Sequence, residues 1–155
     1  MKDSFGREIN YLRISLTDRC NLRCEYCMPE KGIDKLSHKE ILTFEEVYVL
    51  TKAFVDLGIT KIRFTGGEPL VRHGVLDLIS KVSKLDGVKE IAMTTNGTLL
   101  SKYALKLKEA GLNRLNISLD TLDYEKYKEI TRGGDLNKVL DGINAAKEAE
   151  IGRAH

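Results

Sequence analysis

The sequence predicts an α/β fold in which about four strand–helix units build a parallel sheet. Short runs of β-branched and apolar residues alternate with segments of helical periodicity, and this alternation is typical of βα units. Unusual residues follow each run at its downstream end, where parallel α/β folds form their ligand sites. Because βα connections are right-handed, such a sheet either winds open or curls into a barrel.

Four runs have the length and composition of strands. Each is four to eight residues long, rich in Val, Ile, Thr, Tyr or Phe, and followed by a turn or a glycine-rich loop. The loops that follow them read in order as a cysteine-rich segment, "GGEP", "TNG" and "SLDT". The predicted strands are Tyr11–Leu16, Lys61–Thr65, Glu90–Thr95 and Arg114–Leu119.

The first helix has a clear beginning and end. Thr43 followed three residues later by Glu46 is a capping box, and apolar residues then recur at helical spacing until Gly58, which is a typical helix stop. The same periodicity predicts four further helices, the second of which ends at Gly111. They cover residues 74–85, 100–110, 123–131 and 135–149.

Length and charge bound the class of protein. The 155 residues are enough for one domain with a real core, and 25 basic against 23 acidic residues leave a net charge of +2. This balance gives no sign of a nucleic-acid or membrane surface. Because no stretch reads as a signal peptide or approaches about 20 apolar residues, we expect a cytoplasmic protein.

All three cysteines lie in "TDRCNLRCEYCMPE", residues 17–30, which we call the cysteine loop. Cys20, Cys24 and Cys27 are spaced C-x3-C-x2-C. A zinc site completed by His38 or a thioredoxin-like pair is an alternative, but neither the histidine spacing nor the local pattern favours it. Three thiolates on a [4Fe–4S] cluster leave one iron with an open position, which can bind a small molecule.

With Tyr26 before the third cysteine, this loop resembles that of the radical S-adenosylmethionine (radical SAM) family. The resemblance implies a full or partial TIM-type (βα) barrel and a cluster whose open iron binds S-adenosylmethionine. Reduction of the cluster then cleaves that cofactor to a 5′-deoxyadenosyl radical. By the same resemblance, Gly67 in "TGGEP" and Ser118 in "NISLD" are cofactor-binding residues. Glycine suits this role because it lets the backbone approach a ligand closely.

Longer motifs resemble one branch of the family, the GTP 3′,8-cyclases of molybdenum cofactor (molybdopterin) biosynthesis. The motifs are "LRISLTDRCNLRCEYCMP", "FTGGEPLVR", "TTNGTLL", "LNISLDTLD" and "ITRGGDLNKVLDGI". The resemblance implies a lyase that converts GTP to (8S)-3′,8-cyclo-7,8-dihydroguanosine 5′-triphosphate, with Arg13, Arg63 and Thr94 as substrate-binding residues. Two guanidinium groups match the oxygens of a triphosphate, whereas Arg7 reads as a surface arginine.

Family members also have a second, C-terminal [4Fe–4S] cluster, and the sequence has no cysteine after Cys27. We therefore expect residues 1–149 to be the N-terminal part of a radical SAM core, inactive as a cyclase alone. We expect residues 150–155 to be a non-native tail, because "EIGRAH" matches one reading frame of a common sequencing adapter after a leading G. The family pattern has glycine at the position of Glu150.

The resemblance also implies partners. These are GTP, a reductant protein such as a flavodoxin-type electron donor, and a second copy in a homodimer of the full-length form. Two alternatives remain for the function. One is another radical SAM enzyme, of a peptide-modifying or haem pathway, and the other is a non-catalytic metal-binding module. Anaerobic reconstitution distinguishes them, because only the enzymes cleave S-adenosylmethionine.

Overall fold

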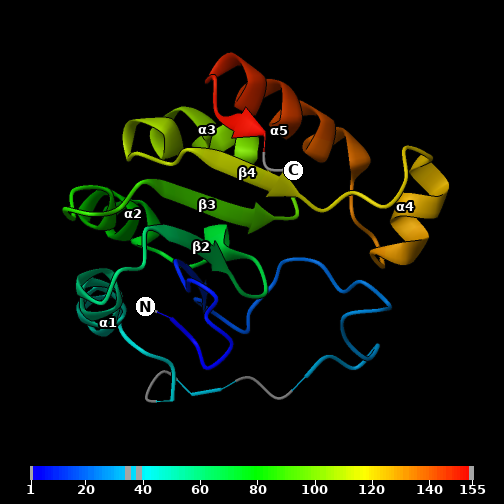
Figure 1. Ribbon diagram of the computed structural model, residues 1–155. Helices are drawn as coiled ribbons and strands as arrows, with labels where there is room; N and C mark the ends of the chain where they lie inside the picture. The colour runs from blue at the N-terminus through cyan, green and yellow to red at the C-terminus, as the bar shows by residue number, and fades with distance from the viewer. Residues whose placement is uncertain (1, 34–35, 38–39, 154–155) are drawn as a thin grey trace.

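The computed structural model describes residues 2–33, 36–37 and 40–153. Its centre is a parallel sheet whose strands lie side by side in the order of the sequence (Figure 1). The four predicted strands are confirmed, the first one residue and the fourth two residues shorter than expected, and a short fifth strand follows them. The strands are β1 (Tyr11–Ser15), β2 (Lys61–Thr65), β3 (Glu90–Thr95), β4 (Arg114–Ile117) and β5 (Gly152–Arg153).

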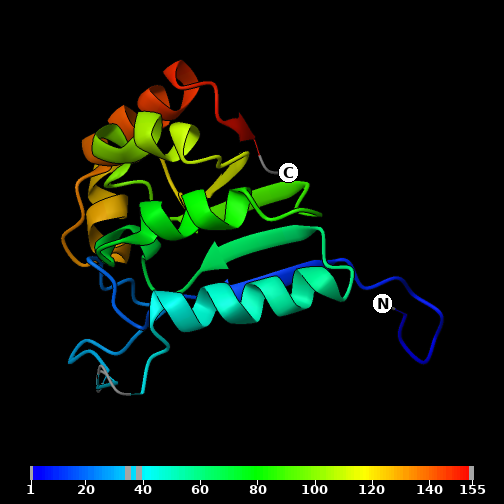
Figure 2. The same cartoon turned by 90° about the vertical axis from the view of Figure 1, so that its left-hand side faces the viewer.

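The helices are α1 (Phe44–Asp56), α2 (Val75–Ser83), α3 (Leu100–Glu109), α4 (Tyr124–Ile130) and α5 (Leu136–Glu148), with a 3-10 turn η1 (Pro69–Val71) before α2. Figure 2 shows α1, α2 and α3 side by side in front of the sheet, and α5 packs on α3. Helix α4 lies beyond the arrowheads of the strands (Figure 1). All five predicted helices are confirmed.

The order of the strands decides between an open sheet and a barrel. A doubly wound sheet reverses its strand order and carries helices on both faces. Here each strand pairs with the next one in sequence, and helices cover a single face. The predicted partial (βα) barrel is therefore confirmed. We call the helix-covered face the outer face and the opposite one the inner face.

Alternation along the strands sorts their side chains between these faces. Ile62 and Phe64 of β2 and Met93 of β3 are 0–1% exposed and pack among the helices. Their neighbours in sequence point to the inner face, because successive side chains of a strand lie on opposite sides. A smaller cluster of Tyr127, Leu136 and Val139 joins α4 to α5.

Local signals in the sequence explain the helix ends. The capping box of α1 is confirmed, since the amide of Glu46 donates to Thr43 Oγ1 (3.2 Å) and the amide of Thr43 donates to Glu46 Oε2 (2.7 Å). Gly58 follows α1 with a φ of +102°, the left-handed conformation for which glycine is preferred. Helix α3 is likewise followed by Gly111 (φ +100°).

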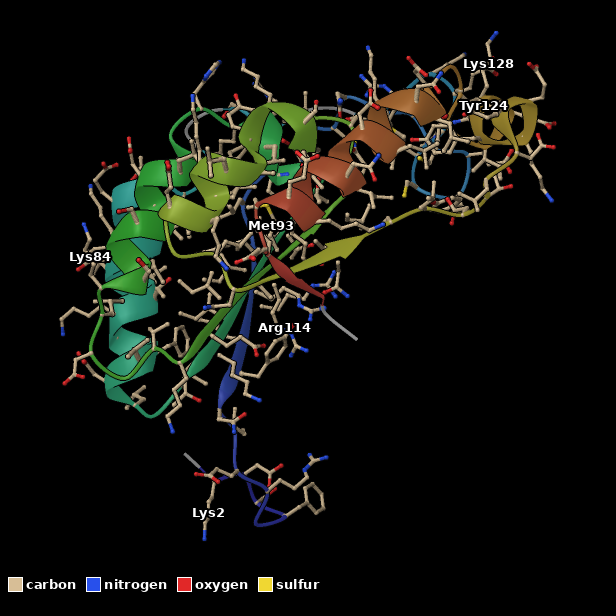
Figure 3. All side chains as sticks on the ribbon, turned by 90° about the horizontal axis from the view of Figure 1, so that it is seen from above. Lys2, Lys84, Met93, Arg114, Tyr124 and Lys128 are labelled. Atoms are coloured by element: carbon tan, nitrogen blue, oxygen red, sulfur yellow. The ribbon has the colours of Figure 1, made fainter. Side chains whose placement is uncertain are left out.

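The two ends of the described chain differ in how they meet the sheet. The segment around Lys2 extends away from the helical layer (Figure 3), and Lys2 forms an antiparallel bridge with Glu8. At the other end, Gly152 pairs in parallel with Arg114, although Gly152 falls in the expected non-native tail. Among the described residues, no helix has the length and apolar character needed to cross a membrane.

Candidate functional site

The loops that follow the strands meet at one rim of the sheet. The cysteine loop follows β1 and runs across this rim to α4 (Figure 1). The amide of Leu16 donates to Thr65 O (2.8 Å) and that of Ser118 donates to Thr95 O (2.9 Å), so adjacent loops leave the sheet together. The four special loops predicted from the sequence therefore share one edge of the sheet.

Within the cysteine loop the three thiols are free. Cys20 and Cys24 are half-buried and Cys27 is exposed. The amide of Leu22 donates to Cys20 Sγ (3.4 Å), and the amide of Cys27 donates to Cys24 O (2.9 Å) in a tight turn. Burial raises the pKa of the Cys24 thiol, and the neighbouring Cys27 and Cys20 raise it further. The three thiols thus differ in exposure, and Cys24 is the one whose pKa burial raises.

The arrangement of the thiols is relevant to the kind of metal centre that the cysteine loop can bind. Among the described residues, no three His, Cys, Asp or Glu side chains are grouped closely enough to hold one metal ion. Two sulfurs on one zinc ion lie within about 4.6 Å of each other, whereas the thiolates of a cubane each bind a different iron. The alternative zinc ligand His38 lies outside the described residues.

The glycines of "GGEP" bring the loop after β2 against the cysteine loop. The amide of Gly67 donates to Thr17 O (2.7 Å), and that of Glu68 donates to Arg19 O (2.8 Å). Gly66 has a φ of +142°, and a Cβ built on it would lie 2.6 Å from Thr17 O. Side chains are excluded here because the two backbones touch. The cofactor-binding role of Gly67 stays a prediction.

Glu68 is a carboxylate with no exposed surface, and it joins two loops. It accepts hydrogen bonds from the amide of Leu70 (3.1 Å), the hydroxyl of Thr95 (2.9 Å) and the amide of Asn96 (2.7 Å). Burial raises the pKa of Glu68, and these three donors oppose the rise. The loops after β2 and β3 are therefore held together from inside.

Tyr26 links the cysteine loop to the loop after β4. Its hydroxyl donates to Asp120 Oδ2 (2.7 Å), and this hydrogen bond is the main reason why the pKa of Tyr26 is raised. Ser118, two residues before Asp120, is exposed at the end of β4. Tyr26, Gly67 and Ser118, the predicted cofactor-binding residues, thus lie on three loops of the same rim.

The end of α4 holds the other side of the cysteine loop. The amide of Glu25 donates to Ile130 O (2.9 Å), and that of Arg23 donates to Thr131 O (3.3 Å). Arg132, whose φ is +52°, donates through Nη1 to Arg23 O (3.0 Å) and Met28 O (2.8 Å). A non-glycine residue in this conformation is uncommon and marks a place where the surroundings impose the backbone.

Tyr127 of α4 is the one large polar side chain of its small core cluster. It is 2% exposed, and its hydroxyl has no hydrogen-bond partner within the described part of the chain. Burial raises its pKa to about 12, with the Cys24 thiol as the next cause. Buried hydroxyls in native proteins nearly always have a partner. This one lies near the cysteine loop without one.

The three residues predicted to bind substrate all lie on the inner face. Arg13 and Arg63 occupy paired positions of β1 and β2, and Ala92 separates Arg63 from Arg114 in the same row. Thr94 pairs with Asn116 in the next row. The structure therefore brings these side chains to one surface below the rim.

The hydrogen bonding on this face is incomplete. Arg13 Nη2 donates to Thr65 Oγ1 at 3.4 Å, and the guanidinium of Arg63 lies over the ring of Tyr11 at 5.9 Å. Arg63 Nε and Asn116 Oδ1 are buried without a partner among the described residues. A donor and an acceptor are thus left for a molecule bound on the inner face.

Sequence reasoning missed several residues of the site. Asn116 could have been found, because it lies two positions before Ser118 and residues at this spacing in a strand share a face. Asp120, Tyr127 and Arg132 could not be found in this way, because their roles depend on contacts with a loop about 100 residues earlier in the chain.

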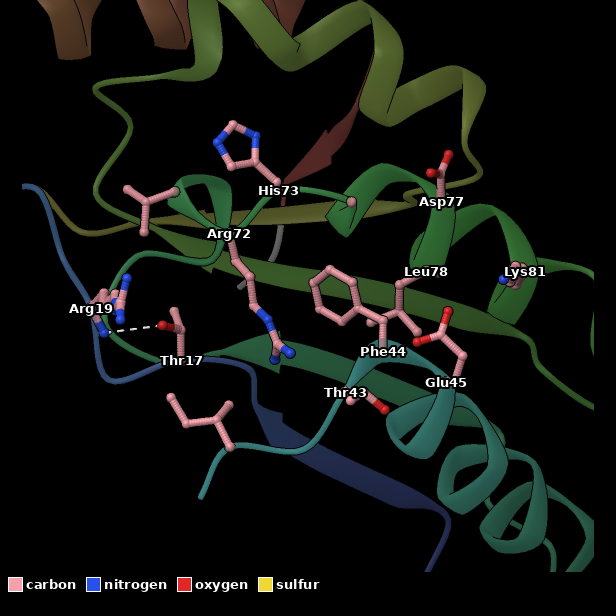
Figure 4. Close-up of a pocket in the computed structure, with 13 residues that line it drawn as sticks. Thr17, Arg19, Thr43, Phe44, Glu45, Arg72, His73, Asp77, Leu78 and Lys81 are labelled. Atoms are coloured by element: carbon pink, nitrogen blue, oxygen red, sulfur yellow. Dashed lines mark hydrogen bonds between the residues drawn. The ribbon is translucent and has the colours of Figure 1, made fainter. Parts of the chain in front are cut away.

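A separate cavity of about 540 Å³ lies between the start of α1 and the start of α2 (Figure 4). Arg72 extends through it, over the ring of Phe44 at 4.1 Å, and donates to Leu16 O (2.6 Å). None of the nine predicted site residues, all of which the structure describes, lines this cavity. Thr17 and Arg19 at the start of the cysteine loop line it, but none of the three cysteines does.

Comparisons with known proteins agree with this geometry. The family described as the radical SAM superfamily matches residues 14–154. A curated GTP 3′,8-cyclase of Alkaliphilus oremlandii (strain OhILAs) is 63% identical over 144 residues, which are 93% of this chain and 45% of that protein. A protein of the same name from Peptoclostridium acidaminophilum is 61% identical over 149 residues, 96% of this chain and 46% of that protein.

The chain thus spans less than half the length of these curated relatives. Among solved structures, a methylornithine synthase superposes with a TM-score of 0.73 at 22% identity, over 96% of this chain and 44% of that one. At this identity the likeness concerns the fold alone. It agrees with the partial barrel described above.

Proposed function

Because the chain belongs to the radical SAM superfamily, we propose that it carries the cluster site, the S-adenosylmethionine site and part of the GTP site of a GTP 3′,8-cyclase. The names and the 53–63% identity of these curated relatives support this activity. The structural observation that carries the proposal is the position of the cysteine loop. It lies on the rim directly above an inner face with two paired arginines.

Membership of the superfamily implies a [4Fe–4S] cluster and S-adenosylmethionine. Cys20, Cys24 and Cys27 would hold three of the four irons. When bound, the cluster supplies the electron that cleaves S-adenosylmethionine. The donor at Cys20 Sγ and the unpartnered hydroxyl of Tyr127 fit a group rich in hydrogen-bond acceptors.

Tyr26, Gly67 and Ser118 would bind S-adenosylmethionine. The hydrogen bond from Tyr26 to Asp120 and the backbone contact between Gly67 and Thr17 support this role. Both contacts connect the cysteine loop to a neighbouring loop, so a cofactor held at the cluster would lie close to loops that are already fixed to one another. The chain's part in the reaction is to position the cofactor and exclude side reactions.

Arg13, Arg63 and Thr94 would bind GTP. Two guanidinium groups on paired strand positions repel each other unless an anion lies between or beside them. The unpartnered Arg63 Nε supports an anionic ligand at this place. A flavodoxin-type electron donor and a homodimer of the full-length form stay predictions, as does the assignment of residues 1–149 to the core and of 150–155 to a non-native tail.

The test is anaerobic reconstitution of the chain with iron and sulfide. We expect a brown protein with about four irons and four sulfides, which forms 5′-deoxyadenosine from S-adenosylmethionine under dithionite. A variant with Cys20, Cys24 and Cys27 all replaced by Ser is the matched control and should remain colourless. Uptake of stoichiometric zinc without colour would instead support a metal-binding module.

A second experiment measures the binding of GTP to the reconstituted chain. We expect Arg63→Gln to weaken binding about tenfold or more, because a charge-assisted hydrogen bond contributes about 1.5–3 kcal/mol. Arg7→Gln removes the same charge from a residue that pairs with Asp3 at the surface, and should have no effect. Cleavage of S-adenosylmethionine with no GTP binding would point to another radical SAM enzyme.

A further inference from the structure

We propose that Asn96 is a positioning residue that makes the cluster easier to reduce, by donating a side-chain N–H to the cluster ligand Cys20. The inference rests on the proposed [4Fe–4S] site. Asn96 lies in the "TNG" turn after β3, and its Nδ2 is 3.7 Å from Cys20 Sγ. This distance suits a hydrogen bond to sulfur, whose radius is larger than that of oxygen.

The orientation of the Asn96 amide follows from its partners. The backbone amide of Thr98 donates to Asn96 Oδ1 (3.0 Å), and the Thr98 hydroxyl donates to the same oxygen (2.7 Å). A backbone N–H can only donate, so the atom facing it must be the oxygen of the side chain. The NH₂ group is thereby turned toward the cysteine loop.

The two N–H bonds of that group have separate acceptors. One is Asn21 Oδ1, at 2.8 Å, and the other is Cys20 Sγ. Asn21 in turn donates through Nδ2 to Thr98 Oγ1 (2.9 Å), which closes a ring of three side chains. Every polar atom of the Asn96 side chain is used, so the donor to sulfur cannot rotate away without breaking other bonds.

The backbone beneath the ring is held as firmly. The amide of Asn96 donates to the buried carboxylate of Glu68 (2.7 Å), and the amide of Gly97 donates to Thr95 Oγ1 (3.1 Å). Asn96 is therefore fixed at both its main chain and its side chain before any cluster binds. Such pre-organisation is what allows a second residue to orient and tune a metal ligand.

The chemical consequence concerns the charge on the cluster. A thiolate ligand carries negative charge, and reduction adds one more electron to the group it binds. N–H donors at the sulfur stabilise the more negative state, so they raise the reduction potential. Cys20 Sγ has two such donors, the amide of Leu22 at 3.4 Å and Asn96. Substitution of Asn96 removes one and leaves the backbone donor.

A purely structural role makes a different prediction. The ring also links the loop after β3 to the cysteine loop, and breaking it anywhere would loosen that link. Asn21→Ala breaks the ring but leaves Asn96 held by Thr98 and Glu68, with its second N–H still facing Cys20. A tuning role therefore predicts unequal effects from Asn96 and Asn21, and a structural role predicts equal ones.

The experiment is a redox titration of the reconstituted cluster, followed by electron paramagnetic resonance, in the parent chain and three variants. For Asn96→Ala we expect the ratio of reduced to oxidised cluster at a fixed potential to fall about tenfold, which corresponds to about 59 mV for one electron. Asn96→Asp keeps the acceptor for Thr98 but places an oxygen at Cys20, and should lower the ratio further. Asn21→Ala should change it less than about twofold.

Three results would overturn the inference. The first is an unchanged potential in both Asn96 variants, and the second is an equal shift in Asn21→Ala. The third is loss of the cluster from both Asn96 variants while their apoproteins unfold like the parent, because Asn96 would then serve assembly. If the parent itself takes up no cluster, the proposed function fails as well, so the two failures are distinguishable.

Discussion

The two faces of the sheet carry different kinds of side chain, although the same strands form both. On the outer face Ile62, Phe64 and Met93 are sealed under helices, with at most 1% of their surface exposed. On the inner face Arg13 and Arg63 occupy the alternate positions, and no helix in the described part of the chain covers that face. Alternation along a strand therefore separates the residues that stabilise the fold from those available for a ligand.

The rim between the faces follows neither pattern. Glu68 and Thr95 are buried there although they are polar, and each is satisfied by hydrogen bonds from a neighbouring loop. Burial of a carboxylate is costly unless such donors surround it. The rim thus has buried, hydrogen-bonded polar side chains beneath the loops of the candidate site. These hydrogen bonds help to hold the loops next to the cysteine loop in place.

We expect the largest loss of stability from a substitution that disrupts the packing on the outer face. Phe64→Ala removes a fully buried aromatic side chain and should lower the free energy of unfolding by about 3–5 kcal/mol. The matched variant is its neighbour, Arg63→Ala, which points to the inner face and should stay within about 1 kcal/mol of the parent. Chemical denaturation of the two variants measures the difference. Similar losses from both would mean that the inner face is packed like the outer one.

An intermediate effect is expected at the rim. Glu68→Gln puts an NH₂ group where the carboxylate accepts three donors, so one buried N–H loses its acceptor at a cost of about 1–3 kcal/mol. The variant also removes a group whose pKa is raised by burial. Denaturation of parent and variant between pH 3.5 and 7.5 tests both statements.

The sign of the pH effect follows from proton binding. With its pKa raised, Glu68 binds a proton in the folded state at pH values where the unfolded chain has released it. The parent's advantage over Glu68→Gln should therefore be fully present below the ordinary glutamate pKa of about 4.3 and decline as the pH rises through the folded value. An advantage that grows with pH would contradict a raised pKa.

We expect the smallest change in stability from a substitution at a helix end in the outer, helical layer. Helices α3 and α5 end with the same type of backbone hydrogen bond, from Leu112 N to Leu107 O (2.9 Å) in α3 and from Ile151 N to Ala146 O (3.1 Å) in α5. The left-handed residue is Gly111 in α3 but Glu150 in α5, where φ is +53°. Glu150→Gly should therefore stabilise the chain by about 1 kcal/mol.

The reciprocal change serves as the control for the helix ends. Gly111→Ala should destabilise the chain by more than about 1 kcal/mol, because a Cβ there would lie 2.6 Å from the Cβ of Ser83. Thermal unfolding of both variants is the measurement. No gain from Glu150→Gly would show that the glutamate adopts its conformation without strain.

Patterns between residues close together in the sequence were enough to predict most of the fold. Two strands were predicted to the residue, and the capping box at Thr43 placed the start of α1, because strand periodicity and helix caps depend on neighbours within a few positions. The same alternation accounts for the inner-face position of Arg13 and Arg63. The fifth strand was not predicted, since two residues carry no periodic signal.

The sequence by itself determined the strand–helix units of a parallel sheet, and through its resemblance to a known family it predicted the partial barrel and the ligand set of Cys20, Cys24 and Cys27. Only the tertiary structure decided what holds the cysteine loop in place. Tyr26 reaches Asp120, Arg132 reaches Arg23, and Asn96 reaches Cys20, across 76 to 109 positions of the chain. Such partners have no spacing rule, because they become neighbours only when parallel strands bring their loops to one rim.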